Sequence, residues 1–250
     1  MGARSASQSD PPSQDSGDSA RELREKKRVL AALVVHDLRS PLSALQGYLG
    51  LLKEELQEGK PPAQALAYVD DCDTLVQKVL GLVATILDVD ELEDGILRAH
   101  LTSVRLAELV ERANAGNRTN FEMRQLALQV HVPPDMIVRL DHNLMGRVIE
   151  NLVDNAARYA PRGGRVEVAA KRADHGVEIA IGNRGPPVPA AERDKIFGRY
   201  HQIEARRVSA RQNRGLGLYF CKLAAEAHGG TIHVEERGEL GAVFVVRLPE

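Results

Sequence analysis

The sequence is poor in three things: net charge, long apolar runs and cysteine. Its formal net charge is −2, which leaves no basic field of the kind that attracts nucleic acid, so we expect no nucleic-acid partner. The apolar run at 30–35, LAALVV, is much shorter than the roughly 18 residues of a membrane span, so we expect no such span. The amino terminus also lacks the charged start and apolar centre of a secretory signal.

The two cysteines, Cys72 and Cys221, stand alone in helix-like and apolar surroundings. We interpret them as buried thiols, and not as a disulfide or as metal ligands. Unpaired thiols and the missing secretory signal predict a cytoplasmic location. With 43% hydrophobic and 27% charged residues, the composition is that of a globular protein, and 250 residues suffice for one or two domains.

Residues 1–19 differ in composition from the rest of the chain. They are rich in Ser, Asp, Gln, Gly and Pro, and they contain no large apolar side chain after Met1. Such a segment cannot bury enough surface to offset the entropy of ordering, so we predict a disordered tail.

Two heptad patterns follow and predict a helical hairpin over residues 20–95. In both helices the apolar residues are spaced alternately three and four apart, as in a coiled-coil seam. EGKPP at 58–62 ends the first helix, and EDG at 93–95 ends the second. The seams are Leu38, Leu42, Leu45, Leu49, Leu52 and Leu56 in the first helix, and Val69, Cys72, Val76, Val79, Val83 and Ile86 in the second.

A two-helix hairpin buries its own apolar seam poorly. Two hairpins that pair into a four-helix bundle bury both seams, so we expect a homodimer. The alternative is that the hairpin packs against the rest of the same chain.

Residues 96–250 change to a mixed pattern that predicts an α+β domain. Between GNRGPP and RGLGL lies a polar, arginine-bearing segment of about 25 residues, and irregular loops of this length are usually functional or mobile. We expect helices at about 105–115, 141–159 and 214–228, and strands at 126–132, 164–170, 176–182, 230–236 and 241–248.

His36 and Asp37 interrupt the leucine pattern of the first helix. At about 100° per residue, His36 points roughly 130° away from the seam, and Ser40 lies on the same helix face as His36. A neutral imidazole has a nucleophilic lone pair, and a nearby carboxylate can hold one ring nitrogen protonated and make the other more nucleophilic. Without a partner site, the same pair would be an ordinary solvated surface feature.

The segment NLVDNAARY at 151–159 supplies a candidate partner site. Asn151 and Asn155 lie one turn apart on one helix face, with Arg158 about one turn further on. Carboxamide oxygens suit magnesium and carboxamide N–H groups suit phosphate, although surface asparagines are the alternative interpretation. RGLGL at 214–218 opens a helix, where glycines allow phosphate to approach the backbone N–H groups.

Five segments, in this order, resemble the motifs of the sensor histidine kinases of two-component signalling. HDLRSPL at 36–42 is similar to their H-box, NLVDNAARY at 151–159 to the N-box and NRGPPVP at 183–189 to the G1 region. KIFGRYHQ at 195–202 is similar to the F-box, and RGLGLYFCKLAAEAHGG at 214–230 to the G2 region. The resemblance implies an α+β fold: a long antiparallel helical hairpin that forms a dimeric four-helix bundle, followed by an α/β-sandwich ATP-binding domain of the GHKL type.

The resemblance also implies roles for the hairpin residues. His36 would be the phosphoacceptor, Asp37 the acid/base that orients and deprotonates it, and Ser40 would occupy the position used in phosphatase activity on the partner. The implied activity is that of an ATP-dependent protein-histidine kinase, which passes the phosphoryl group from His36 to an aspartate on a response regulator receiver domain. Because there is no room for a sensor domain before His36, we consider a separate sensor protein as a source of the signal.

The ATP-binding domain, expected at 96–250, would bind ATP and Mg2+. By the resemblance, Asn155 would ligate magnesium with support from Asn151, and Gly215 and Gly217 would cradle the phosphates. The full set of implied nucleotide contacts is Asn151, Asn155, Arg158, Tyr159, Asn183, Gly185, Arg214, Gly215, Leu216 and Gly217.

The chain departs from the family pattern at the nucleotide site. Asn183 replaces an aspartate that recognises the adenine amino group, and the uncharged amide oxygen should weaken that hydrogen bond by about 1–2 kcal/mol. Pro187 replaces a glycine, and the first glycine of the G2 pattern is missing before Gly215. Two alternatives to a kinase therefore stay open: a non-catalytic scaffold that has lost useful ATP binding, and a phosphatase or phosphotransfer module in which ATP is regulatory.

Overall fold

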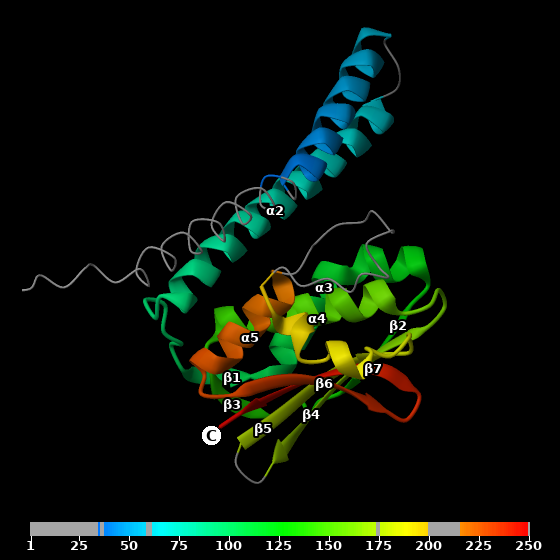
Figure 1. The fold of residues 1–250 in the computed structure, drawn as a ribbon. Helices are drawn as coiled ribbons and strands as arrows, with labels where there is room; N and C mark the ends of the chain where they lie inside the picture. Colours follow the sequence, from blue (N-terminus) through cyan, green and yellow to red (C-terminus); the bar gives the residue numbers. More distant parts are fainter. Residues whose placement is uncertain (1–34, 36–37, 59–61, 174–175, 200–215, 250) are drawn as a thin grey trace, which may run out of the picture. The chain divides into compact units, whose positions relative to one another are not determined.

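The computed structural model describes residues 35, 38–58, 62–173, 176–199 and 216–249 (Figure 1). The predictions for the tail, for His36 and Asp37, and for Arg214 and Gly215 lie outside the described residues. The chain divides into two compact units, Met1–Val79 and Leu80–Glu250, and each is considered by itself. The domain boundary after residue 95 stays a prediction.

The first unit contains a helical hairpin. Its first helix is continuous over residues 38–57, and helix α2 (Pro62–Glu93) follows after a short connection. Tyr48 and Tyr68 join the two helices, with ring centroids 6.0 Å apart. Among the described residues, no helix combines the length and the apolar character that crossing a bilayer requires.

Each predicted heptad seam separates into two rows that differ in exposure. In the first helix, Leu38, Leu45 and Leu52 are half-buried, which is the expected state of residues inside a hairpin. The other row of that helix is open to solvent, with Leu42, Leu49 and Leu56 exposed by 45, 50 and 68%. Helix α2 repeats the arrangement, with Cys72, Val79 and Ile86 half-buried and Val69, Val76 and Val83 exposed by 47, 38 and 38%.

The second unit contains a five-stranded sheet of order β2-β4-β5-β7-β6. Strands β2 and β4 are parallel and all the other neighbours are antiparallel, so the sheet is mixed. The five strands are β2 (Ala127–His131), β4 (Arg165–Ala173), β5 (Gly176–Asn183), β6 (Thr231–Arg237) and β7 (Leu240–Leu248), and all five lie where the sequence predicted strands.

A second, two-stranded sheet was not predicted. It pairs β1 (Thr102–Arg105) with β3 (Ile137–Leu140) in antiparallel fashion. Each strand has only four residues, which is too short for an alternating pattern to stand out in the sequence.

Three helices cover one face of the five-stranded sheet (Figure 1). They are α3 (Leu106–Arg124), α4 (His142–Tyr159) and α5 (Gly217–Ala227), and two short 3₁₀ turns, η1 (Ala190–Glu192) and η2 (Lys195–Phe197), precede α5. Helix α4 is central because its apolar stripe is fully buried in the shared core. The buried stripe comprises Leu144, Met145, Val148, Ile149, Leu152, Val153, Ala156 and Ala157.

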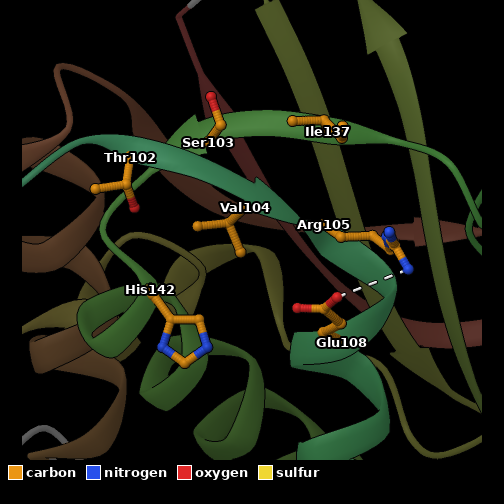
Figure 2. A pocket seen from close by; sticks show the side chains of 7 residues that line it. All are labelled: Thr102, Ser103, Val104, Arg105, Glu108, Ile137 and His142. Atoms are coloured by element: carbon orange, nitrogen blue, oxygen red, sulfur yellow. Dashed lines mark ion pairs between the residues drawn. The ribbon is translucent and has the colours of Figure 1, made fainter.

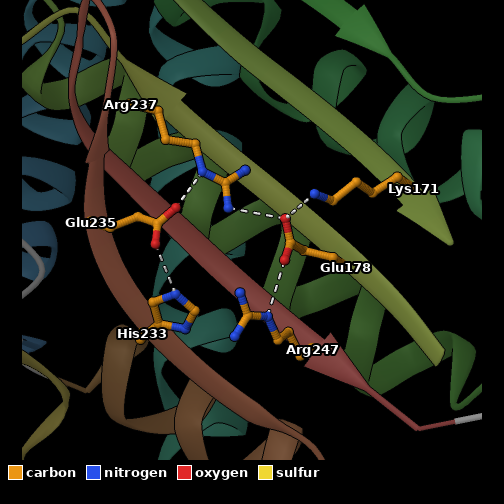
Figure 3. A network of polar contacts seen from close by, with 6 residues as sticks. All are labelled: Lys171, Glu178, His233, Glu235, Arg237 and Arg247. Carbon is orange, nitrogen blue, oxygen red and sulfur yellow. Dashed lines mark hydrogen bonds and ion pairs between the residues drawn. The ribbon is translucent and has the colours of Figure 1, made fainter. Parts of the chain in front are cut away.

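On the opposite face of the sheet, charged side chains and no helix are found among the described residues. Ala180, Val243 and Val245 form a small apolar cluster there. Beside this cluster, Glu178 is only 5% exposed and lies among cationic groups. Figure 3 shows Lys171, Arg237 and Arg247 converging on its carboxylate, with nitrogen–oxygen distances of 3.3, 3.0 and 3.0 Å.

The last turns of α2 belong to the second unit. Val89 is fully buried in the core that α3, α4 and α5 share, and Leu92 packs against the same core. The end of α2 is therefore part of the second unit and not a free extension of the hairpin.

Candidate functional site: the junction of α4, β5 and α5

Helix α4 carries Asn151 and Asn155, and its start is fixed by Asp141. The Asp141 carboxylate accepts hydrogen bonds from the backbone N–H groups of Asn143 and Leu144, both at 2.9 Å. Burial opposes ionisation of this carboxyl, but the backbone hydrogen bonds that it accepts outweigh burial and lower its pKa. The amino end of α4 is thus already occupied by an anion from the chain itself.

His228, near the end of α5, also holds the start of α4. Its Nε2 accepts the backbone N–H of Asp141 at 2.9 Å, and its Nδ1 lies 2.7 Å from the carbonyl oxygen of Ala224. Nε2 thus serves as the acceptor on the α4 side, and Nδ1 faces the carbonyl oxygen on its own helix. His228 therefore links the end of α5 to the beginning of α4.

The predicted residues of α4 are partly exposed along one edge of the helix. Asn151 and Asn155 are half-buried, so their carboxamides reach the surface of the unit. Arg158 forms an ion pair with Asp154 one turn earlier, so in this structure it is held by a neighbour on its own helix. Tyr159 ends the helix and is 36% exposed.

Gly217 brings the start of α5 against Asn151. A β-carbon on Gly217 would lie 3.1 Å from Asn151 Oδ1, so any larger residue would crowd the carboxamide. Leu216 precedes it and is buried, and its carbonyl accepts the N–H of Phe220 at 2.7 Å. Within the part of the chain that the structure describes, no side chain caps the amino end of α5, in contrast to α4.

Asn183 ends β5 inside the unit. It is 1% exposed, and its Nδ2 has no hydrogen-bond partner among the described residues. A β-carbon on Gly185 would overlap Asn183 Nδ2 and lie 2.6 Å from the carbonyl oxygen of Tyr159. Glycine at 185 therefore lets the end of α4 and the end of β5 approach each other. Gly241 packs in turn against the carbonyl oxygen of Gly185.

Arg124, which the sequence did not single out, caps the carboxyl end of α4. Its guanidinium donates to the carbonyl oxygens of Arg158 and Ala160 at 2.7 and 2.8 Å, and also to that of Ala157. Positive charge at the end of a helix stabilises its exposed carbonyl groups. These hydrogen bonds fix the position of the end of α4, where Tyr159 lies.

A further set of contacts that the sequence did not single out joins the end of α2 to α4. Arg147 of α4 pairs with Asp88, donates to Thr85 Oγ1 at 3.0 Å and stacks over the ring of Phe220 at 4.4 Å. Burial lowers the pKa of its guanidinium, although the carboxylate of Glu150 opposes this. Arg147 and Asp88 belong to no recognised motif, so a single sequence contains no signal from which this contact could be predicted.

A surface hollow lies at the other end of α4 from Asn155. It is bounded by the two-stranded sheet, by His142 and by the ion pair of Arg105 with Glu108 (Figure 2). Neither Asn183 nor Gly217 lines it. The hollow is therefore separate from the place where α4, β5 and α5 meet.

The groups at this junction have the chemistry that a nucleotide needs. A buried amide whose nitrogen has no partner among the described residues can bind a base edge. Partly exposed carboxamides can contact magnesium and phosphate, and an uncapped helix start can accept an anion. Predicted residues from α4, β5 and α5 meet there. Ser40 lies in the hairpin, exposed on the first helix, in the other unit.

The fold and this junction define an ATP-binding domain of a known class. Residues 140–250 match the family model described as "Histidine kinase-, DNA gyrase B-, and HSP90-like ATPase". Residues 26–95 match a second model, the "His Kinase A (phospho-acceptor) domain". Together these two domains show that the chain belongs to the sensor histidine kinases of two-component signalling, as the sequence motifs predicted.

Individual relatives agree with this assignment. The alginate biosynthesis sensor protein KinB of Pseudomonas aeruginosa is 29% identical over 232 residues, which are 91% of this chain and 38% of KinB. The first curated relatives that the chain matches are longer proteins, and it spans between 23 and 56% of their length.

Solved structures show the same fold. The catalytic domain of histidine kinase ThkA is 25% identical with a TM-score of 0.53, and the match covers 60% of this chain and 97% of that domain. ThkA in complex with response regulator protein TrrA is 20% identical with a TM-score of 0.58, covering 96% of this chain and 68% of that chain. The predicted fold, a helical hairpin followed by an α/β ATP-binding domain, is confirmed.

Proposed function

We propose that the chain is an ATP-dependent protein-histidine kinase that autophosphorylates His36 and then phosphorylates an aspartate on a response regulator. The observation that carries this proposal is the contact of Asn151 with Gly217. It joins the helix that carries the carboxamides to a helix start that no described side chain caps, and an open helix start of this kind favours the binding of phosphate.

The nucleotide would lie across the junction, with its base at β5 and its phosphates at α5. Asn183 would accept a hydrogen bond from the adenine amino group, and Gly185 would give the base access to the buried amide. Tyr159 and Arg158 would contact the nucleotide from the end of α4, with Arg158 exchanging Asp154 for phosphate. The phosphates would be held by Arg214, Gly215, Leu216 and Gly217.

Asn155 is proposed as the magnesium ligand, with Asn151 supporting the same site. Magnesium keeps several waters and binds phosphate oxygens, so a single side-chain oxygen from the protein suffices. When bound, the ion would neutralise charge on the phosphates. The half-buried carboxamide of Asn155 offers an oxygen ligand at the surface of the unit.

The transfer itself would use the hairpin residues. The unprotonated ring nitrogen of neutral His36 would bond to the γ-phosphorus while the bond from that phosphorus to the bridging oxygen breaks, and ADP leaves. Asp37 would orient the ring and take the proton from its other nitrogen. In the second step, an aspartate oxygen of the regulator would attack the phosphohistidine, which restores His36. Ser40, one turn along, would serve the reverse task of removing phosphate from the regulator.

The exposed leucine and valine rows support a homodimer. Their seven-residue spacing in both helices fits a four-helix bundle formed with a second hairpin. The complex of ThkA with TrrA supports a response regulator as partner. ATP as donor and two free cysteines fit a reducing compartment, the cytoplasm.

Incubation with γ-labelled ATP and Mg2+ tests the proposal. We expect stable label on the wild-type chain, none on His36→Ala and strongly reduced label on Asn155→Ala, followed by loss of label when a cognate receiver domain is added. Equal labelling of His36→Ala would contradict the assignment of the phosphoacceptor. Absence of Mg-ATP binding at millimolar concentration would favour the scaffold, and ATP binding without labelling would favour the phosphatase or phosphotransfer module.

A further inference from the structure

The last turn of α2 holds two residues that are far away in the sequence. Arg199 donates to Glu93 Oε2 at 2.7 Å and to Asp90 Oδ1 at 2.9 Å. The hydroxyl of Tyr219 donates to the other oxygen of the same carboxylate, Glu93 Oε1. One side chain of α2 thus binds residues 106 and 126 positions further along the chain.

The contacts of Glu93 are partly shielded from water. The side chains of Arg199 and Glu93 are 28 and 27% exposed, so water screens the pair less than it would at an open surface. Burial, and then the hydrogen bond to Glu93, raise the pKa of Tyr219 to about 12. The phenol is therefore a neutral donor at physiological pH.

Tyr219 lies at the start of α5, where the proposed function places the phosphates. It is in the first turn of the helix, two residues after Gly217. In an α-helix, fixing a side chain in the first turn limits rotation and translation of the N–H groups in that turn. These are the groups that the proposed function assigns to the phosphates.

We infer that Glu93 is a positioning residue for nucleotide binding, which ties the phosphate-binding start of α5 and Arg199 to the end of helix α2. The inference rests on the proposed function, because it requires the phosphates to lie at the start of α5. It adds a direct connection between α2 and that site. By linkage, a change in α2 that moves Glu93 alters the affinity for ATP, and bound ATP in turn favours the bonded arrangement of Glu93.

The same helix provides a matched control. Glu91 is exposed, lies two residues before Glu93, and no side-chain contact of Glu91 is found within the described parts of the chain. Its backbone carbonyl accepts the N–H groups of Ile96 and Leu97, which a side-chain substitution leaves in place. Glu91→Ala therefore removes the same charge from the same turn without touching Arg199 or Tyr219.

The test measures the Kd of Mg-ATP for the full chain by calorimetry, together with the melting temperature. We expect Glu93→Ala to weaken binding about five- to tenfold, Tyr219→Phe to weaken it to a similar extent, and Glu91→Ala to leave it unchanged. Because Tyr219→Phe keeps the packed ring, it tests the hydrogen bond even if Glu93→Ala lowers the melting temperature. The double variant should bind Mg-ATP no more weakly than the more affected single variant, since the hydrogen bond between Tyr219 and Glu93 is already lost in each single variant.

A wild-type Kd in both Glu93→Ala and Tyr219→Phe would overturn the inference. So would an equal loss of affinity in Glu91→Ala, because the effect would then follow from charge alone. If the wild-type chain itself bound no Mg-ATP, the proposed function would fail, and that result is distinct from either of these.

Discussion

The side-chain oxygen of Asn151 lies 3.1 Å from the point that a β-carbon on Gly217 would occupy. Two motifs that are separated by 66 positions in the sequence meet at this contact. At this distance any side chain at 217 would press on the carboxamide of Asn151.

Gly217→Ala tests this relationship. The added methyl group must displace the carboxamide by a few tenths of an ångström, so we expect Mg-ATP affinity to fall by about fivefold while the melting temperature changes little. Gly116→Ala is the control, because a β-carbon there meets nothing within 4 Å. That variant should bind ATP normally and gain roughly 0.5–1 kcal/mol of stability as a glycine removed from a helix interior. Unchanged affinity in Gly217→Ala would argue against a nucleotide at the start of α5.

Asn183→Asp introduces the charge that the family pattern has at this position. In the absence of nucleotide, a charged carboxylate replaces a neutral amide that is 1% exposed and whose nitrogen has no partner among the described residues, so we expect a lower melting temperature. With ATP, the charged acceptor strengthens the hydrogen bond to the adenine amino group, and affinity should rise about three- to tenfold. Thermal-shift titration with ATP measures both effects. A variant that is less stable but no tighter for ATP would place the base elsewhere.

Arg124→Met tests the cap at the end of α4. The variant leaves three carbonyl groups without their donor, and we expect a loss of about 2 kcal/mol in the free energy of unfolding, measured with urea. Arg118→Met, on the same helix but in an exposed pair with Glu122, should show no measurable change. Similar stability of the two variants would mean that the cap contributes nothing beyond an ordinary surface charge.

Much of the fold follows from the sequence because its elements have clear periods. The apolar stripe of α4 and the alternation in β4 are strong local signals, and both elements lie within a few residues of their predicted positions. Helix α3 extends nine residues beyond its predicted end, to Arg124, through a stretch with glycine and asparagines. Burial of Phe121 and the bonds of Arg124 to α4 hold that extension, and these contacts are not local.

Within the candidate site, only the residues that belong to sequence motifs could be predicted. Asn151 and Gly217 could be paired because each lies in a pattern with a known order. Glu93 and Arg147 could not, because one sequence does not show which of its many charged residues meet across 60 or more positions. Tertiary contacts of this kind depend on the assembled fold.

Glu178→Gln tests the charged network on the face of the sheet opposite α3, α4 and α5. Burial opposes ionisation of this carboxyl, but the hydrogen bonds from Arg247, Arg237 and Lys171 outweigh burial and lower its pKa to about 2. The pKa is thus below the value of about 4.3 of an unfolded chain, so its contribution to stability is full above about pH 5 and is lost as the pH falls toward 2.

We expect Glu178→Gln to cost roughly 1–3 kcal/mol at pH 7 and much less near pH 2.5, as measured by urea unfolding at both values. The control is Glu108→Gln, which removes an exposed carboxylate 3.8 Å from Arg105 and should cost under about 0.5 kcal/mol at either pH. A penalty for Glu178→Gln that stays constant with pH would show that charge is not what stabilises this face.

The burial of Val89 determines where this protein can be recombined with others. The valine is fully enclosed by the core of the second unit, although it belongs to a helix that begins at Pro62. A chimaera that joins a foreign helical stem to this catalytic unit must therefore keep the native sequence from about Leu80 onward. A junction placed at the end of α2, near Glu93, would exchange a core side chain and the partners of Arg147 in α4, Tyr219 in α5 and Arg199, and would produce a misfolded hybrid.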